Sequence, residues 1–182
     1  MISPCSQIDP PIIPSIAPAI IPAMLLAAGL FLLLPACSEP VDIEAEKAAV
    51  ERAVRGSIEW ALNKDKDLLF SVMAHDEDFF IWHPDSTSTV TSWEQFARMT
   101  DEVFMAPTFR AIRTELKDLH IGLTRDGSAA WFRTHLDDIG EWSGVEAGWL
   151  NVRWSGTLEK RPDGWKIVQM HFSFPTDRFA GH

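Results

Sequence analysis

The sequence predicts one α+β domain behind a distinct N-terminal segment, and three observations support this class. Apolar residues recur at helical spacing over residues 42–63, between charged side chains. Strand-like runs rich in aromatic and β-branched residues dominate the second half of the chain. The last two runs flank an Asp-Gly turn and predict an antiparallel hairpin over residues 149–174. Helices followed by a run of strands indicate an α+β fold whose sheet curls around the helices.

The remaining elements are predicted from turn, cap and alternation signals between these two landmarks. In chain order we expect a short helix capped by Asp65, a strand over 79–83, a helix opened by a capping box over 91–94, strands over 109–121 and 129–137, and a loop over 138–148. The loop assignment depends on three glycines in that last segment.

Residues 1–36 differ from the rest of the chain. They contain no Lys or Arg, and an uncharged, mostly apolar run over 16–34 precedes Leu-Pro-Ala-Cys. This pattern resembles a bacterial lipoprotein signal, in which Cys37 is acylated and becomes the new N-terminus. Residues 37–41 then form a tether, residues 42–178 form the domain, and the protein is anchored to the bacterial cell envelope by lipid. A retained membrane helix and a start at Met24 remain the alternatives.

Charge and cysteine content narrow the possible partners. The net charge of −10 disfavours nucleic acid, because nucleic-acid binding rests on neutralising phosphates with Lys and Arg. Removal of Cys5 and acylation of Cys37 would leave a domain without a thiol, and so without a cysteine metal site or nucleophile. The His and acids over 75–78 lack a recognisable ligand spacing, so we interpret them as a solvated loop. No metal or cofactor is expected.

The predicted hairpin carries polar side chains where a purely structural sheet would bury apolar ones. Strand alternation places Arg153 on one face of the first arm together with Trp149. On the second arm, the same rule groups His171 with Ile167 and Trp165. Faces that mix Arg and His with Trp and Ile favour a semi-polar cavity.

The same hairpin resembles the SnoaL-like branch of the NTF2-like superfamily. That branch ends in an Arg-aromatic-Ser/Thr strand, an Asp-Gly-x-Trp turn and strand, and a terminal His-x-Ser. The positions that match are Arg153, Ser155, Asp163, Gly164, Trp165, Ile167, His171 and Ser173. The resemblance covers residues 43–174 and implies a cone, in which a strongly curved antiparallel sheet wraps around N-terminal helices. It also implies a pocket at the wide end and a homodimer formed through the sheet.

If the pocket lies where the resemblance implies, its lining comes from the first helix, the 79–83 and 131–137 strands and the hairpin. The expected ligand-binding residues are Trp60, Phe80, Trp82, Trp131, Arg133, His135, Arg153 and His171. Arg153 is either a guanidinium that holds the sheet together or an anchor for an anionic group. His171 is either a hydrogen-bonded core histidine or an acid/base.

Two further pairs, His135 with Asp137 and His83 with Asp85, are open to the same two interpretations, a solvated face or an oriented acid/base. The chain contains no Tyr. Steroid-isomerase-like and scytalone-dehydratase-like members use tyrosines to polarise a substrate oxygen, so that machinery is missing here.

The leading hypothesis is therefore a lipid-anchored domain that binds a small, partly apolar molecule without catalysis. The eight tryptophans make a flat apolar ligand plausible. One alternative is a cyclase, isomerase or dehydratase that uses His171, His135 or Asp137 as acid/base, with no catalytic residue assigned more firmly. A second is a protein-interaction module that uses the outer face of the sheet.

Overall fold

The computed structural model describes residues 41–85 and 87–175. All of them fall within one unit of the chain, Glu39–His182. The predicted signal over 1–36, the lipidation residue Cys37 and the tether up to residue 40 lie outside the described residues. No helix in the described ranges is long and apolar enough to cross a membrane.

Three helices and one π-helical turn precede most of the sheet. Helix α1, Ile43–Asn63, begins where the Asp42 side chain accepts from the Ala45 amide, and it ends at Lys64 in the left-handed conformation (φ 53°). Helix α2, Lys66–Val72, is capped by Asp65 as predicted. Helix α3, Trp93–Met99, is capped by Ser92 and runs directly into the π-turn η1, Thr100–Phe104.

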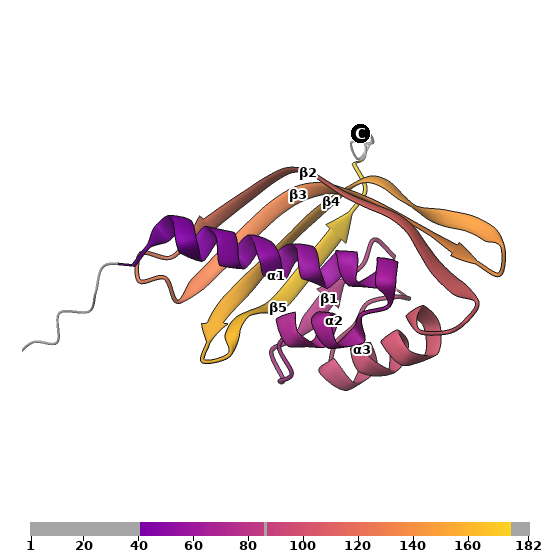
Figure 1. The fold of residues 1–182 in the computed structure, drawn as a ribbon, viewed down its shortest axis with the longest axis horizontal. Helices are drawn as coiled ribbons and strands as arrows, with labels where there is room; N and C mark the ends of the chain where they lie inside the picture. Colours follow the sequence, from indigo (N-terminus) through magenta and orange to yellow (C-terminus); the bar gives the residue numbers. More distant parts are fainter. Residues whose placement is uncertain (1–40, 86, 176–182) are drawn as a thin grey trace, which may run out of the picture. The chain divides into compact units, whose positions relative to one another are not determined.

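Five strands form a single sheet in the order β1-β5-β4-β3-β2. The strands are β1 Phe80–Trp82, β2 Phe109–Leu123, β3 Ala129–Trp142, β4 Val145–Arg161 and β5 Gly164–Ser173. All neighbours are antiparallel except β1, which pairs in parallel with β5. Helix α1 lies across one face of the curved sheet (Figure 1) and contacts β2, β5 and α2. The predicted α+β cone is confirmed.

The core lies between α1 and the inner face of the sheet. Val50 and Val54 of α1 are fully buried against it. The facing strands contribute alternate residues that are also buried, namely Phe132, Leu136, Val152, Trp154, Leu158 and Ile167. Close packing continues to the backbone, since a Cβ on Gly156 would lie 2.6 Å from the Phe132 ring.

The loop predicted over 138–148 is wrong, because β3 and β4 continue through it as a paired ribbon. Trp142 pairs with Val145, and the reversal takes only Ser143 and Gly144, both at positive φ (52° and 84°). Gly148 allows the two backbones to approach closely, since a Cβ there would lie 2.2 Å from the Asp138 carbonyl oxygen. The glycines therefore serve the ribbon and do not interrupt it.

Two of the register irregularities in the sheet decide which side chains of β4 and β5 face inward. On β5, Leu158 pairs with Ile167 and Thr157 with Gln169, so Val168 is an extra residue. On β4, Leu136 pairs with Val152 but Asp138 pairs with Trp149, so this strand also carries an extra residue, next to Asn151 at φ 53°. Each bulge reverses the alternation of inward and outward side chains along its strand. A prediction that assumes strict alternation through the bulge therefore assigns the residues beyond it to the wrong face.

Candidate functional site

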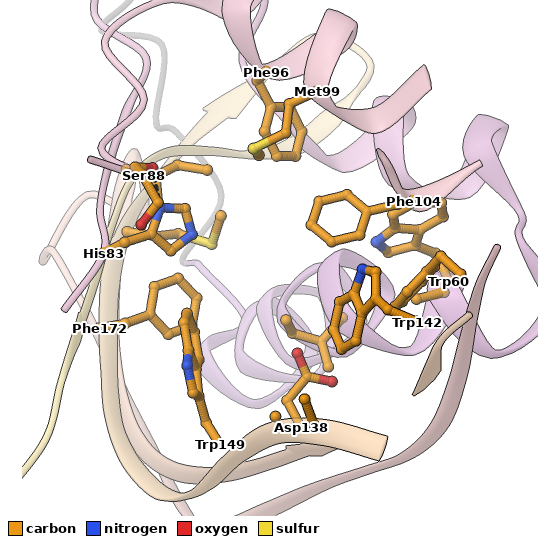
Figure 2. A pocket seen from close by; sticks show the side chains of 17 residues that line it. Trp60, His83, Ser88, Phe96, Met99, Phe104, Asp138, Trp142, Trp149 and Phe172 are labelled. Carbon is orange, nitrogen blue, oxygen red and sulfur yellow. Dashed lines mark hydrogen bonds between the residues drawn. The ribbon is translucent and has the colours of Figure 1, made fainter. Parts of the chain in front are cut away.

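A cavity of about 590 Å³ lies at one end of the inner face of the sheet (Figure 2). Its walls come from the C-terminal part of α1, from α3 and η1, from the β3–β4 ribbon and from β5. The segment that follows β1 completes it. The lining residues are Ile58, Trp60, Ala61, Ile81, His83, Ser88, Phe96, Met99, Phe104, Phe109, Asp138, Trp142, Ala147, Gly148, Trp149, Met170 and Phe172.

Aromatic side chains form a large part of this surface and contact one another. Seven of the lining residues are Phe or Trp. On one wall Phe109 contacts Trp142, with ring centroids 4.8 Å apart, and on another Trp149 contacts Phe172 at 5.4 Å. Tilted contacts of this kind hold the rings in place, so packing among the lining residues maintains the shape of the cavity.

Asp138 is the one acidic side chain among the described lining residues. It shares the inner face of β3 with Leu136, and its carboxyl group points into the cavity (Figure 2). Burial raises the pKa of Asp138 to about 6, and no hydrogen bond or neighbouring charge offsets this effect. The group therefore exchanges a proton close to neutral pH.

His83 supplies the second titratable group, from a different wall. Its Nδ1 lies 2.6 Å from the Ser88 carbonyl oxygen, which can only accept, so Nδ1 carries the hydrogen. The ring stacks on Phe172 at 5.5 Å. Burial lowers the pKa of His83 and favours the neutral imidazole. Its free Nε2 is then a hydrogen-bond acceptor, and it lies on the cavity side of the ring (Figure 2).

Asp137, one residue earlier, points to the opposite face of the sheet and has a different role. Its carboxylate accepts from Lys117 Nζ at 2.7 Å and from the Asn151 amide at 2.7 Å, and Arg113 lies 3.4 Å away. These partners, Lys117 first, lower the pKa of Asp137. A carboxylate held in this way stabilises the bulge on β4, and it does not face the cavity that Asp138 lines.

Of the eight expected ligand-binding residues, the structure places only Trp60 in the cavity lining. The other seven do not line it, and the expected position of these seven is corrected. They are Phe80, Trp82, Trp131, Arg133, His135, Arg153 and His171. The bulge at Val168 accounts for His171, because Ile167 and Met170 both face inward and His171 must then face outward.

These seven residues nevertheless lie together, on the outer face of the sheet. Trp82 pairs with His171 across β1 and β5, and His135 pairs with Arg153 across β3 and β4. Trp82 and Trp131 are about half exposed, at 54% and 51%. The acid/base alternative built on His171, His135 or Asp137 therefore lacks a shared cavity.

Asp138 and Trp142 are the principal site residues that sequence reasoning missed. A signal for both was available. Ala130, Phe132, Thr134 and Leu136 alternate on the buried face, and Asp138, Gly140 and Trp142 continue the same parity. The three glycines of this segment instead favoured the prediction of a loop.

Fold and cavity together define a small-molecule-binding domain of the NTF2-like class. The chain belongs to the SnoaL-like domain family, whose model matches residues 50–177. Both statements confirm the resemblance seen in the C-terminal hairpin.

Solved structures agree on the fold. A dehydratase candidate of the NTF2-like family from Streptomyces avermitilis superposes with a TM-score of 0.59 at 18% identity, covering 73% of this chain and 99% of that one. An NTF2-like superfamily protein from Salmonella enterica gives 0.59 at 22%, covering 76% and 96%. An aromatic ring hydroxylase candidate from Novosphingobium aromaticivorans gives 0.60 at 14%, covering 73% and 91%. No curated protein matches the chain.

The raised pKa of Asp138 predicts how stability changes with pH. Well below pH 4 the carboxyl group is protonated in both the folded and the unfolded chain. As the pH rises towards 6 the unfolded chain releases its proton first, so this group lowers stability, by at most about 3 kcal/mol above pH 7. The free energy of unfolding of Asp138→Asn minus that of the wild type should therefore increase between pH 4 and pH 7, measured by urea denaturation.

Asp137→Asn is the matched comparison, because the pKa of Asp137 is lowered whereas that of Asp138 is raised. Asp137 stabilises the fold above the ordinary carboxyl pKa of about 4 and loses this contribution as the pH falls below it. The Asp137→Asn variant should therefore be less stable than the wild type throughout pH 4 to 7, a difference of opposite sign to that of Asp138→Asn at pH 7. Parallel pH profiles for the two variants would contradict the assignment of Asp138 to a desolvated site.

Proposed function

We propose that the domain binds a small, mostly apolar molecule in the cavity over Asp138. The observation that carries this proposal is the lining itself, in which aromatic and aliphatic side chains surround two titratable groups that come from different walls. The volume of about 590 Å³ falls in the range of ordinary ligand pockets. Apolar surface supplies the affinity for such a ligand, while Asp138 and His83 orient it.

Filling the cavity tests this proposal. Ala147 lines the cavity and is exposed, so Ala147→Phe adds volume without disturbing the core. We expect binding of the neutral probe 2-naphthol, followed by quenching of tryptophan fluorescence, to weaken by about tenfold or more. The control is Arg153→Ala/His171→Ala, which alters only the outer face and should bind within about twofold of the wild type. Loss of binding in the control alone would place the ligand on the outer face.

Proton transfer at Asp138 is a second candidate function, and the position of this carboxyl group favours it. General acid/base groups work best when their pKa lies near the working pH, and that of Asp138 is raised to about 6. In such a reaction the Asp138 carboxylate takes a proton from a carbon next to a carbonyl group and returns it to the resulting enolate. Asp138 thereby replaces the acid/base residues expected from the sequence.

Deuterium exchange tests this second candidate. With 2-tetralone in D₂O, the wild type should accelerate exchange at the carbon next to the carbonyl, and Asp138→Asn should lower that rate by about 100-fold or more. The outer-face double variant should retain the full rate. Probe binding without accelerated exchange in the wild type would leave a binding domain and exclude this chemistry for such ketones.

Attachment to the cell envelope through Cys37 is part of the same proposal and rests on the Leu-Pro-Ala-Cys sequence after the apolar run. Cys37→Ser should move the protein from the membrane fraction to the soluble fraction of the producing bacterium and abolish acylation, as seen by mass spectrometry. Cys5→Ser is the control and should leave both unchanged, since Cys5 belongs to the removed segment. Acylation that persists in Cys37→Ser would refute this attachment.

A further inference from the structure

We infer that the cavity selects an organic cation, with an ammonium group beside Asp138 and an apolar body among the aromatic rings. This inference rests on the proposed binding function and names its ligand class. Three features of the site support it: a carboxyl group without a positive partner, a surrounding surface of aromatic side chains, and a second titratable group that presents a lone pair.

The first feature is the missing counter-charge at Asp138. Described lining residues from α1, α3, η1, β2, β4 and β5 include no Lys or Arg, and the remaining titratable group is the neutral His83. Lys117 and Arg113 are committed to Asp137 on the other face. Lys64, beside Phe109, donates to the carbonyl oxygens of Met105 and Ala106. A buried carboxylate is stabilised most by a positive charge, which a ligand must bring here.

The second feature is the aromatic surface around this carboxyl group. Trp142, Trp149 and Phe172 lie on the walls around Asp138, with Trp60 and Phe104 farther along (Figure 2). The face of an aromatic ring carries partial negative charge and attracts cations, most strongly for Trp. Rings and carboxylate together match an alkylammonium group, whose charge is spread over an apolar shell.

The third feature is the polarity of the remaining group. His83 donates through Nδ1 to Ser88, so it presents only the Nε2 lone pair to a ligand. The two titratable side chains of the cavity therefore both present lone pairs when Asp138 is ionised, and they favour a positively charged group on the ligand. Long-range electrostatics act in the same direction, because the chain carries a net charge of −10 and attracts cations. An anionic ligand finds no guanidinium here, since Arg153 lies on the outer face.

Phenyltrimethylammonium and tert-butylbenzene test the inference, because they share one shape and differ in charge. At pH 8 the wild type should bind the cation about tenfold more tightly than the hydrocarbon, as measured by ligand-observed NMR titration. Asp138→Asn should remove this preference by weakening the cation about tenfold and leaving the hydrocarbon within about twofold. Lowering the pH from 8 to 5 should weaken the cation alone, because Asp138 becomes protonated.

The outcomes separate this inference from the function on which it rests. If both probes bind equally well and Ala147→Phe weakens both, the cation preference is overturned. The proposed binding of apolar molecules in the cavity would still stand. A preference for the cation that survives in Asp138→Asn would overturn the role of this carboxyl group. Binding of neither probe would overturn the inference and count against the binding function. The outer-face double variant should match the wild type with both probes.

Discussion

The carboxylate of Asp137 joins three strands and determines the geometry around the cavity. It accepts from Lys117 on β2 and from the Asn151 amide on β4, each at 2.7 Å, while it belongs to β3. The Asn151 bond lies where β4 gains its extra residue, so the bulge has a fixed position. Beyond this point the alternation of β4 is reversed, and Trp149 turns inward opposite Asp138. A wall of the cavity thus depends on a polar contact on the other side of the sheet.

Two adjacent aspartates illustrate how the face of a sheet decides chemistry. Asp137 is surrounded by donors and positive charge, which lower its pKa, and it serves the fold. Asp138 faces rings and aliphatic groups, which raise its pKa, and it remains free to act on a ligand. The residue types are identical, and only their direction differs. Burial of the Asp138 carboxyl group lowers the stability of the fold. A local loss of stability of this kind is typical of functional sites, because groups placed for reactivity or binding are often not in their most stable environment.

The outer face of the sheet carries a different chemistry from the cavity. Arg133, Arg153, His135 and His171 lie there on neighbouring strands, beside the exposed Trp82 and Trp131. Arginine, histidine and tryptophan side chains are thus gathered on one face of a protein with a net charge of −10. The inner face is the reverse, with aromatic groups and a single carboxylate. One sheet therefore separates an outer face that carries arginines from a cavity lined by a carboxyl group and aromatic rings.

The sequence alone was sufficient for the fold class, the family and most of the elements. These properties follow from local signals: helical periodicity over 42–63, the cap at Asp65, and the Asp-Gly turn of the terminal hairpin. Of the residues expected to line a pocket, Trp60 does lie in the wall of the cavity.

Only the tertiary structure decided which side chains meet in the cavity. One extra residue in β5 sends His171 outward, and one in β4 turns Trp149 inward. A bulge is stabilised by contacts between strands, such as the bond from Asn151 to Asp137, and these contacts join residues 14 positions apart in the chain. Alternation along a single strand does not contain that information, because one inserted residue reverses every face beyond it.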